Sequence, residues 1–328
     1  MNRLVSLKVT LATLAFAAAA TANAQGGFPT RPITLVVPFS PGGSVDMVAR
    51  MVADKWGQVL GQPVLIDNRA GAATIVAADY VQKAAPDGYT LLIGTSTTFV
   101  VNPIIYPKVP YDSIKSFEPV GVIGSNALAL LVNAANVKAN TVQELLADVK
   151  AKPGTYSYGS HGNGTTVHFA AEMLWSAAKL KDVVHIPYKG SAPMLTDLQG
   201  GQIPVGFDAI PAAATAVKGG RVRILAVTGE KRSPLLPNVP TIAESGFPGF
   251  KMTSWFGIVG PKQMPANVRE QLEKALQATM TDPAIVKKLS DAGFDPAWTP
   301  AAKYAELVKT DTAMLTPIAK ANNISATD

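Results

Sequence analysis

A strand pattern, two adjacent glycines and a helix pattern follow one another without a break in residues 33–46. The apolar and β-branched run ends at Pro38, and the spacing typical of an amphipathic helix begins after Gly43. Gly42 and Gly43 let the backbone turn sharply and leave no Cβ atom between the main chain and a ligand. Ser44 is predicted to cap the helix, whose first N–H groups then face the loop. Because a helix N-terminus carries partial positive charge, this unit predicts either an anion-binding loop or an ordinary strand-to-helix turn.

Residues 1–24 have the three-part pattern of a secretory signal peptide. Arg3 and Lys8 precede an apolar run at 9–20, and Ala-Asn-Ala at 22–24 fits a cleavage site. We therefore predict export and cleavage after Ala24; the alternative is a buried N-terminal helix. The run is too short to span a bilayer, and no later stretch reaches about 18 uninterrupted apolar residues. The processed chain is therefore not expected to be embedded in a membrane.

The composition excludes several classes of protein. Hydrophobic residues make up 48% of the chain and charged residues 16%, which suits buried cores and not a disordered chain. Cysteine is absent, so disulfides, thiol catalysis and thiolate metal sites are excluded. The net charge of +6 comes without a dense Lys/Arg run, so no nucleic-acid partner is expected. This charge either attracts anionic solutes or is ordinary surface charge. The length of 328 residues suits two domains.

Strand and helix patterns alternate after the opening unit. The predicted elements are helices at 49–60 and 72–85 and strands at 64–66 and 89–93. A β-α-β-α-β series predicts a parallel sheet with helices on both faces. Ligands of such sheets bind at the carboxyl ends of the strands. The loop expected at 94–98, which includes Thr95 and Ser96, lies at such an end and offers hydroxyl groups.

The middle of the chain repeats this order and contains a second glycine loop. The expected elements are a strand at 123–132 interrupted at 124–126, a helix at 141–150, a strand at 156–158, a helix at 167–178, and strands at 183–186, 203–207 and 222–227. The loop 159–166 therefore stands between a strand and a helix N-terminus. Thr141 and Glu144 form a capping box at the start of their helix. The interruption at 124–126 is predicted to be a crossing between two domains.

The last third begins with a proline-rich surface segment at 234–248. A strand pattern at 254–259 is predicted to be the second crossing between the domains. Helical patterns follow at 266–280, at 283–291 and from Pro300 onward. Thr299 and Pro300 are expected to cap and open the last helix, and Pro317 to kink or end it. Two α/β halves, each with a glycine loop, predict a ligand-binding cleft between them.

Five motifs give the chain its resemblance to a known family. They are Pro-Phe-Ser-Pro-Gly-Gly-Ser-Val-Asp at 38–46, Asp-Asn-Arg-Ala-Gly-Ala at 67–72, Pro-Asp-Gly-Tyr-Thr-Leu at 86–91, Tyr-Lys-Gly-Ser-Ala-Pro at 188–193 and Leu-Leu-Pro-Asn-Val-Pro-Thr at 235–241. In this order, from about Arg31 to the C-terminus, the sequence resembles the solute-binding proteins of tripartite tricarboxylate transporters, the Bug receptors. Ala73 and Thr74 depart from the pattern, because the family commonly has another glycine there.

The resemblance implies a periplasmic-binding-protein fold of the Venus flytrap, type II-like kind, with two α/β domains joined by two crossing strands. The implied division is a signal peptide at 1–24, a first domain at 25–125 and 250–328, and a second domain at 126–249. The implied function is that of a periplasmic receptor. It would capture a small carboxylate in the interdomain cleft and deliver it to the membrane subunits of a tripartite tricarboxylate transporter. We expect a monomer with no metal or other cofactor.

In this family, the loop after the first strand and a glycine loop of the second domain pinch one carboxylate, largely through main-chain groups and water. The matching residues of the first loop are Phe39, Ser40, Pro41, Gly42, Gly43, Ser44, Val45 and Asp46. Those of the second loop are Ser160, His161, Gly162, Asn163, Gly164, Thr165 and Thr166. The residues near other strand ends, expected to select the distal half of the solute, are Thr95, Ser96, Lys189 and Asp208. Phe39 is expected to offer an apolar wall, and Asp46 to orient the first loop. His161 is expected either to donate to an anion or to face solvent.

The motifs argue against an enzyme. His161, His168 and His185 form no His-Glu-x-x-His zinc motif, and residues 94–98 lack the closing glycine of a nucleophile elbow. The glycines of 159–166 do not give the dinucleotide-binding fingerprint. We therefore expect no catalytic residues, and a secreted hydrolase stays a remote alternative. A binding subunit that serves a signalling sensor also stays open. So does the solute, whether a tricarboxylate, a dicarboxylate, an acidic amino acid or an aromatic carboxylate.

Overall fold

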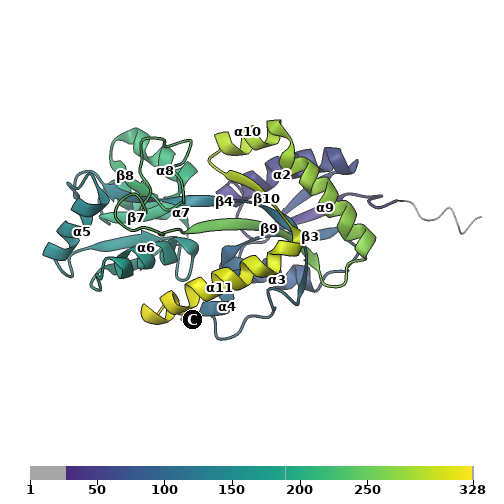
Figure 1. The fold of residues 1–328 in the computed structure, drawn as a ribbon, viewed down its shortest axis with the longest axis horizontal. Coiled ribbons are helices and arrows are strands. Elements are labelled where there is room, and N and C mark those ends of the chain that lie inside the picture. The colour runs from purple at the N-terminus through teal and green to yellow at the C-terminus, as the bar shows by residue number, and fades with distance from the viewer. Residues whose placement is uncertain (1–26, 189, 327–328) are drawn as a thin grey trace, which may run out of the picture.

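The first three strands and the helices between them form the unit that the alternating pattern predicts (Figure 1). Its elements are β1 (Ile33–Val37), α2 (Ser44–Leu60), β2 (Val64–Asn68), η1 (Ala72–Thr74), α3 (Ile75–Gln82) and β3 (Thr90–Thr95). β1 pairs in parallel with both β2 and β3. The computed structural model describes residues 27–188 and 190–326, so the predicted signal peptide and Lys189 lie outside the described residues.

The middle of the chain builds a second α/β unit. Its elements are α5 (Val142–Ala151), β5 (Ser157–Ser160), α6 (Thr166–Ala177), β6 (Val184–Pro187), α7 (Ser191–Gly200), β7 (Val205–Ala209), α8 (Ile210–Ala216), η3 (Val217–Gly219) and β8 (Val222–Val227). β5 pairs in parallel with β6 and β7. The predicted capping box is confirmed, because the Thr141 hydroxyl accepts from the Glu144 amide and the Glu144 carboxylate accepts from the Asn140 amide.

Two long antiparallel strands, β4 (Phe117–Asn133) and β9 (Thr253–Pro261), join the two units. β4 pairs with β9 over residues 117–127 and with β7 and β8 beyond them. The strand order β2-β1-β3-β9-β4-β7-β5-β6 therefore places β4 in both halves of the sheet. This arrangement is the predicted one of two α/β units joined by two strands. The predicted domain limits at 125/126 and 249/250 stay a prediction.

β4 is longer than the strand predicted at 123–132, and no interruption occurs at 124–126. Its register with β9 shifts near Gly124 instead. Gly124 has a φ of 135°, and a Cβ atom there would lie 2.3 Å from the carbonyl oxygen of Asp295. Asp295 begins β10 (Asp295–Pro300), a strand that the sequence did not predict. The glycine therefore permits the close approach of β10 and does not break β4.

The C-terminal elements are α9 (Ala266–Thr281), α10 (Pro283–Asp291), η4 (Ala301–Lys303) and α11 (Tyr304–Ala321). Thr299 and Pro300 end β10, and Pro300 is also the N-cap residue of η4. The helical segment therefore begins one residue later than predicted, and Thr299 does not cap it. α11 continues past Pro317 for another four residues, so Pro317 does not end it. Leu315 and Ala319 on either side of Pro317 are buried. Their packing maintains the helix, because tertiary contacts outweigh local helix propensity.

The hydrophobic residues gather in three buried clusters. One lies on the sheet face covered by α2, α9 and α10, where Trp56 is fully buried. A second lies beneath α7 and α8. The largest runs through both halves, from Val36 of β1 to Phe207 of β7. α11 packs on α4 (Asn102–Ile105) and on α6, so the C-terminal helix bridges the two halves along one side of the molecule (Figure 1).

Candidate ligand-binding site

The first glycine loop places an uncapped helix end at the carboxyl edge of the sheet. α2 begins at Ser44, and its N-cap residue is Gly43, with extended backbone (φ −80°, ψ 172°) and no side-chain capping bond. The prediction that Ser44 caps the helix is therefore wrong. Its hydroxyl oxygen instead accepts a hydrogen bond of 2.7 Å from Nδ2 of Asn126 on β4. The first N–H groups of α2 have no partner within the helix and face the exposed loop 40–43.

Asp46 holds this loop against the helix. Its carboxylate is 2% exposed; Oδ2 accepts from the Gly42 amide and from Nε of Arg50, each at 2.9 Å. Oδ1 accepts from Nδ2 of Asn68 at 2.9 Å, and the same amide group donates to the Phe39 carbonyl. Burial raises the pKa of Asp46, but the bonds from Arg50, Gly42 and Asn68 outweigh it and leave the pKa below its usual value. Asp46 thus orients the loop as a charged group.

Arg50 and Asn68 hold the Asp46 carboxylate, and neither was among the predicted site residues. Arg50 lies four residues after Asp46 on α2, the spacing at which helix side chains form ion pairs. Asn68 lies in the Asp-Asn-Arg motif that was used only to establish the family resemblance. Both signals were present in the sequence, but only the structure shows that they meet at one carboxylate.

Three strands place polar side chains on one sheet face beneath the start of α2. Asn126 of β4 is directly opposite Ser254 of β9, and the hydroxyls of Ser254 and Ser96 are 3.4 Å apart. Thr95 ends β3, opposite Phe256 of β9. Thr95 and Asn126 are 2% and 4% exposed. We call Thr95, Asn126 and Ser254 the polar floor. Asn126 was not predicted as a site residue, although a polar residue within an otherwise apolar strand run is a usable signal.

The loop predicted at 94–98 is not a loop. Gly94 and Thr95 belong to β3, and Thr97 begins a π-helical turn, η2 (Thr97–Val101). A Cβ atom on Gly94 would lie 2.3 Å from the Phe99 ring, so the glycine lets this ring pack against the strand. Thr95 and Ser96 still reach the carboxyl edge of the sheet, as predicted, but as buried residues of regular structure.

The second glycine loop lies where the two halves meet. It follows Ser160 at the end of β5 and leads to α6, whose N-cap Thr165 accepts from the His168 amide. Gly164 has a φ of 66°, and a Cβ atom there would overlap the side chain of Ile105 on α4. The loop therefore packs directly against the first unit. Thr166 is buried as the first residue of α6, and Asn163 is exposed.

Two stacked histidines support this loop from behind. The rings of His168 and His185 are 3.8 Å apart; Nδ1 of His168 accepts from the Gly164 amide, and Nε2 of His185 is 2.6 Å from the Ser160 hydroxyl. Burial, together with the neighbouring His185, lowers the pKa of His168 to about 3. Burial lowers the pKa of His185 to about 4. Both rings are therefore neutral near pH 7. In the sequence, these two histidines show only that they form no zinc motif.

Asp208 lies near the carboxyl end of β7 and accepts hydrogen bonds from two neighbouring residues. It is fully buried at the end of β7 and accepts from the Ser191 hydroxyl at 2.5 Å and from the Ala209 amide at 2.7 Å. Nε2 of His161 lies 3.0 Å from the same carboxylate, without the alignment of a hydrogen bond. The predicted alternatives for His161 were donation to an anion and exposure to solvent. His161 instead lies against the Asp208 carboxylate, and its side chain is 22% exposed.

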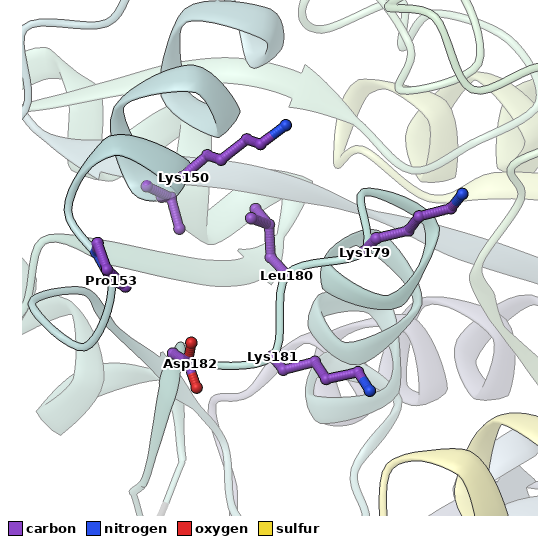
Figure 2. A pocket seen from close by; sticks show the side chains of 7 residues that line it. Lys150, Pro153, Lys179, Leu180, Lys181 and Asp182 are labelled. Carbon is purple, nitrogen blue, oxygen red and sulfur yellow. The ribbon is translucent and has the colours of Figure 1, made fainter.

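Two measurable cavities lie away from these loops. One, of about 280 Å³, is lined by Lys150, Lys179, Lys181 and Asp182 between the ends of α5 and α6. In Figure 2 the amino groups of its lysines extend away from Asp182, so the charges do not converge on one point. The other, of about 550 Å³, is lined by residues of α3 and its surroundings, including Arg69 and Tyr80. Neither contains a residue of the two glycine loops.

Within 27–188 and 190–326, no cluster of three His, Cys, Asp or Glu side chains is arranged to hold a metal ion. In the same part of the chain, no helix is long and apolar enough to cross a membrane.

Comparison with protein families decides the identity of the chain. The model of the tripartite tricarboxylate transporter family receptor matches residues 48–324. The chain belongs to this receptor family. The predicted resemblance is confirmed, and the family and fold are those of solute-binding receptors.

Relatives of this receptor cover nearly its whole length. A Pseudomonas protein named for its place in the tcbD-tcbE intergenic region is 40% identical over 286 residues, covering 87% of this chain and 84% of the relative. An R. palustris protein solved with adipate is 35% identical with a TM-score of 0.84, covering 91% of this chain and 99% of that one. MatC from Rhodopseudomonas palustris, with bound malate, is 29% identical with a TM-score of 0.77, covering 89% and 99%. These likenesses confirm the predicted periplasmic-binding-protein fold.

Proposed function

We propose that this receptor captures one small carboxylate between the first glycine loop and the second, and delivers it to the membrane subunits of a tripartite transporter. The observation that carries the proposal is the uncapped start of α2, braced by Asp46 and exposed at loop 40–43. Unpaired helix N–H groups bind anions without a lysine or arginine. Structural relatives that bind adipate and malate support a carboxylate as the anion.

The second glycine loop is the proposed opposite wall. Its contact with Ile105 brings it to the boundary between the halves, and the Ser44–Asn126 bond brings the first loop to the same boundary. Phe39, which packs at the edge of the core, is the proposed apolar wall. Thr95, Ser96, Lys189 and Asp208 remain proposed contacts for the distal half of the solute. Amides and ordered water are sufficient to bind a carboxylate at such a site.

The proposed location, processing and domain limits of the protein are based on the family to which it belongs. We propose that the protein works as a monomer in the periplasm after cleavage at Ala24, with residues 25–125 and 250–328 as one domain and 126–249 as the other. N-terminal sequencing of the exported protein tests the cleavage site. A mature chain that begins elsewhere would change that boundary without affecting the binding site.

Calorimetric titration of the exported protein with a panel of carboxylates tests the function. We expect saturable one-to-one binding of at least one member and recovery of the ligand unchanged by mass spectrometry. Recovery of a chemically altered ligand in proportion to the protein would instead favour the hydrolase alternative. Uptake of the bound carboxylate by cells with and without the receptor then separates transport from sensing: unchanged uptake would contradict delivery to a transporter.

A further inference from the structure

Two segments of the chain begin with capping boxes that use a glutamate. The Thr141 hydroxyl accepts from the Glu144 amide, and the Glu144 carboxylate accepts from the amide of the residue before Thr141. The Thr241 hydroxyl accepts from the Glu244 amide, and the Glu244 carboxylate accepts from the Thr241 amide. In both boxes, the acceptor that returns the bond is a carboxylate, as is usual at this position.

α6 has the same reciprocal arrangement with a histidine in place of the glutamate. The Thr165 hydroxyl accepts from the His168 amide at 3.3 Å, and Nδ1 of His168 accepts from the Gly164 amide at 3.0 Å. Because a backbone N–H can only donate, Nδ1 carries no hydrogen, and the bond exists only while the ring is neutral. Gly164 is also the residue that packs on Ile105 of α4. His168 therefore fixes the second glycine loop where it meets the first unit.

The charge of the acceptor is important at α6 because this helix begins at a proposed binding loop. The Thr165 amide donates to the Gly162 carbonyl, and the His168 amide is used by the capping bond. Of the first amides of α6, those of Thr166 and Val167 then stay available for an anion. A glutamate in the place of His168 would add a negative charge within the same turn. The imidazole supplies the same bond without that charge.

We infer that His168 is a positioning residue that determines specificity for anions: it shapes the second glycine loop as a capping glutamate would and keeps the start of α6 uncharged, so that this helix end accepts a carboxylate. The inference rests on the proposed function. The ionisable groups that face the ring are His185 of β6, Tyr158 of β5 and Glu172. Glu172 accepts from the Tyr158 hydroxyl and lies one turn further from the start of α6.

Three variants of the exported protein separate the shape of the loop from its charge. His168→Gln provides a neutral acceptor, His168→Glu differs from it only by the charge, and His168→Ala has no acceptor. The ligands are adipate, malate, succinate, citrate, glutamate and benzoate, titrated by calorimetry at pH 8. For the ligand that the wild type binds most tightly, His168→Gln should retain most of the affinity. His168→Glu should bind it about ten- to a hundredfold more weakly than His168→Gln, because two like charges lie within one helix turn.

The pH dependence of the difference between His168→Glu and His168→Gln distinguishes charge from a change of shape. Burial, Glu172 and the bound anion all favour the protonated form of the new carboxyl group. The difference in affinity should therefore narrow between pH 8 and pH 5 as this group takes up a proton. A difference that is the same at both pH values would assign the loss to shape and overturn the inference.

Glu144→Gln is the matched control, because it changes the charge of the α5 capping box, which belongs to neither glycine loop, by the same one unit. Its affinity should equal that of the wild type, and a shift as large as that between the His168 variants would overturn the inference. So would equal binding by His168→Glu and His168→Gln. If His168→Glu does not fold, His168→Gln and His168→Ala decide, since equal affinities of these two would overturn the positioning role. Failure of the wild type to bind any of the six ligands would contradict the proposed function itself.

Discussion

Gly42 and Gly43 are adjacent but are glycine for different reasons. Gly42 has a φ of 86°, a left-handed conformation that costs other residues free energy. Gly43 has a φ of −80°, which any residue adopts, and a Cβ atom there would meet only the Ser40 carbonyl at 3.8 Å. The fold therefore tolerates a side chain at Gly43. What that side chain would obstruct is the space in front of the first helix amides.

Gly43→Val should consequently weaken carboxylate binding by about ten- to a hundredfold, the effect of losing one charge-assisted hydrogen bond. Its stability should fall by no more than about 1 kcal/mol, since valine is a poorer N-cap residue than glycine. Gly42→Ala is the control and should lower the melting temperature, because alanine at this φ costs about 1–2 kcal/mol. Calorimetry and thermal unfolding on both variants separate the effects. Wild-type affinity in a folded Gly43→Val protein would rule out this loop as the binding site.

His168 and His185 should make stability depend on pH below about 6.5. Because burial holds their folded-state pKa values near 3 and 4, the unfolded chain binds more protons once the pH falls below the ordinary histidine pKa. Stability is then lost between about pH 6.5 and 4, at up to about 1.4 kcal/mol per pH unit for each ring. Glu172, which accepts from the Tyr158 hydroxyl, acts in the opposite sense, since burial raises its pKa.

Urea unfolding at several pH values between 7 and 4.5 measures this slope. His185→Gln keeps a polar group near Ser160 and removes one titrating ring, so its slope should be shallower than that of the wild type. If the free energy of unfolding changed with pH equally in the two proteins, His185 would be protonated in the folded state as readily as in the unfolded chain.

At the scale of elements, the first loop and α2 behave as one unit because Asp46 connects them. Its two oxygens accept hydrogen bonds from Gly42, Arg50 and Asn68. An asparagine in its place must turn its NH₂ group toward one of these donors, whichever way the amide is oriented. The charge of Asp46 is therefore needed for the shape of the loop and not only for its electrostatics.

Asp46→Asn should for this reason both destabilise the protein, by about 1.5–3 kcal/mol, and weaken ligand binding. Arg50→Gln, which leaves the Gly42 and Asn68 bonds in place, should have a smaller effect on both. Chemical denaturation and calorimetry give the two quantities. Equal stability of Asp46→Asn and the wild type would show that the loop holds its shape without this carboxylate.

At the scale of the whole molecule, β4, β9 and α11 connect two halves that each carry one proposed binding loop. β4 and β9 run between the halves, and α11 packs on α4 and α6 (Figure 1). A ligand that touches both loops binds the closed arrangement more tightly and shifts the population toward it. Closure must then move α6 relative to α11 as well as bend the two strands.

Small-angle scattering should therefore show a smaller radius of gyration at saturating ligand than without ligand. Gly43→Val at the same ligand concentration is the control, because it should remain open if binding is lost. An unchanged scattering curve at saturation proven by calorimetry would mean that the halves are rigid or already closed.

Much of this protein could be predicted from local sequence. The order of the strands from β1 to β8, the Thr141 capping box, both glycine loops and the family follow from patterns within a few residues, whereas the helices α4, α7 and α8 were not predicted. Glycine, proline and side-chain capping act on the backbone over one or two turns, so such signals can be read without knowing the fold. The glycine loops were recognisable for this reason, although the cap of α2 was assigned one residue too late.

Tertiary structure decided what depends on residues far apart in the chain. Asn126 meets Ser44 across 82 positions because the register of β4 against β9 sets which face its side chain occupies. β10 forms a strand by pairing with β4, which it can approach closely at Gly124. The burial of Leu315 and Ala319 lets α11 continue past Pro317. His168 and His185 become a neutral stacked pair only when β6 and α6 bury them together. Packing and burial fix these features, and both are properties of the assembled sheet that no short stretch of sequence contains.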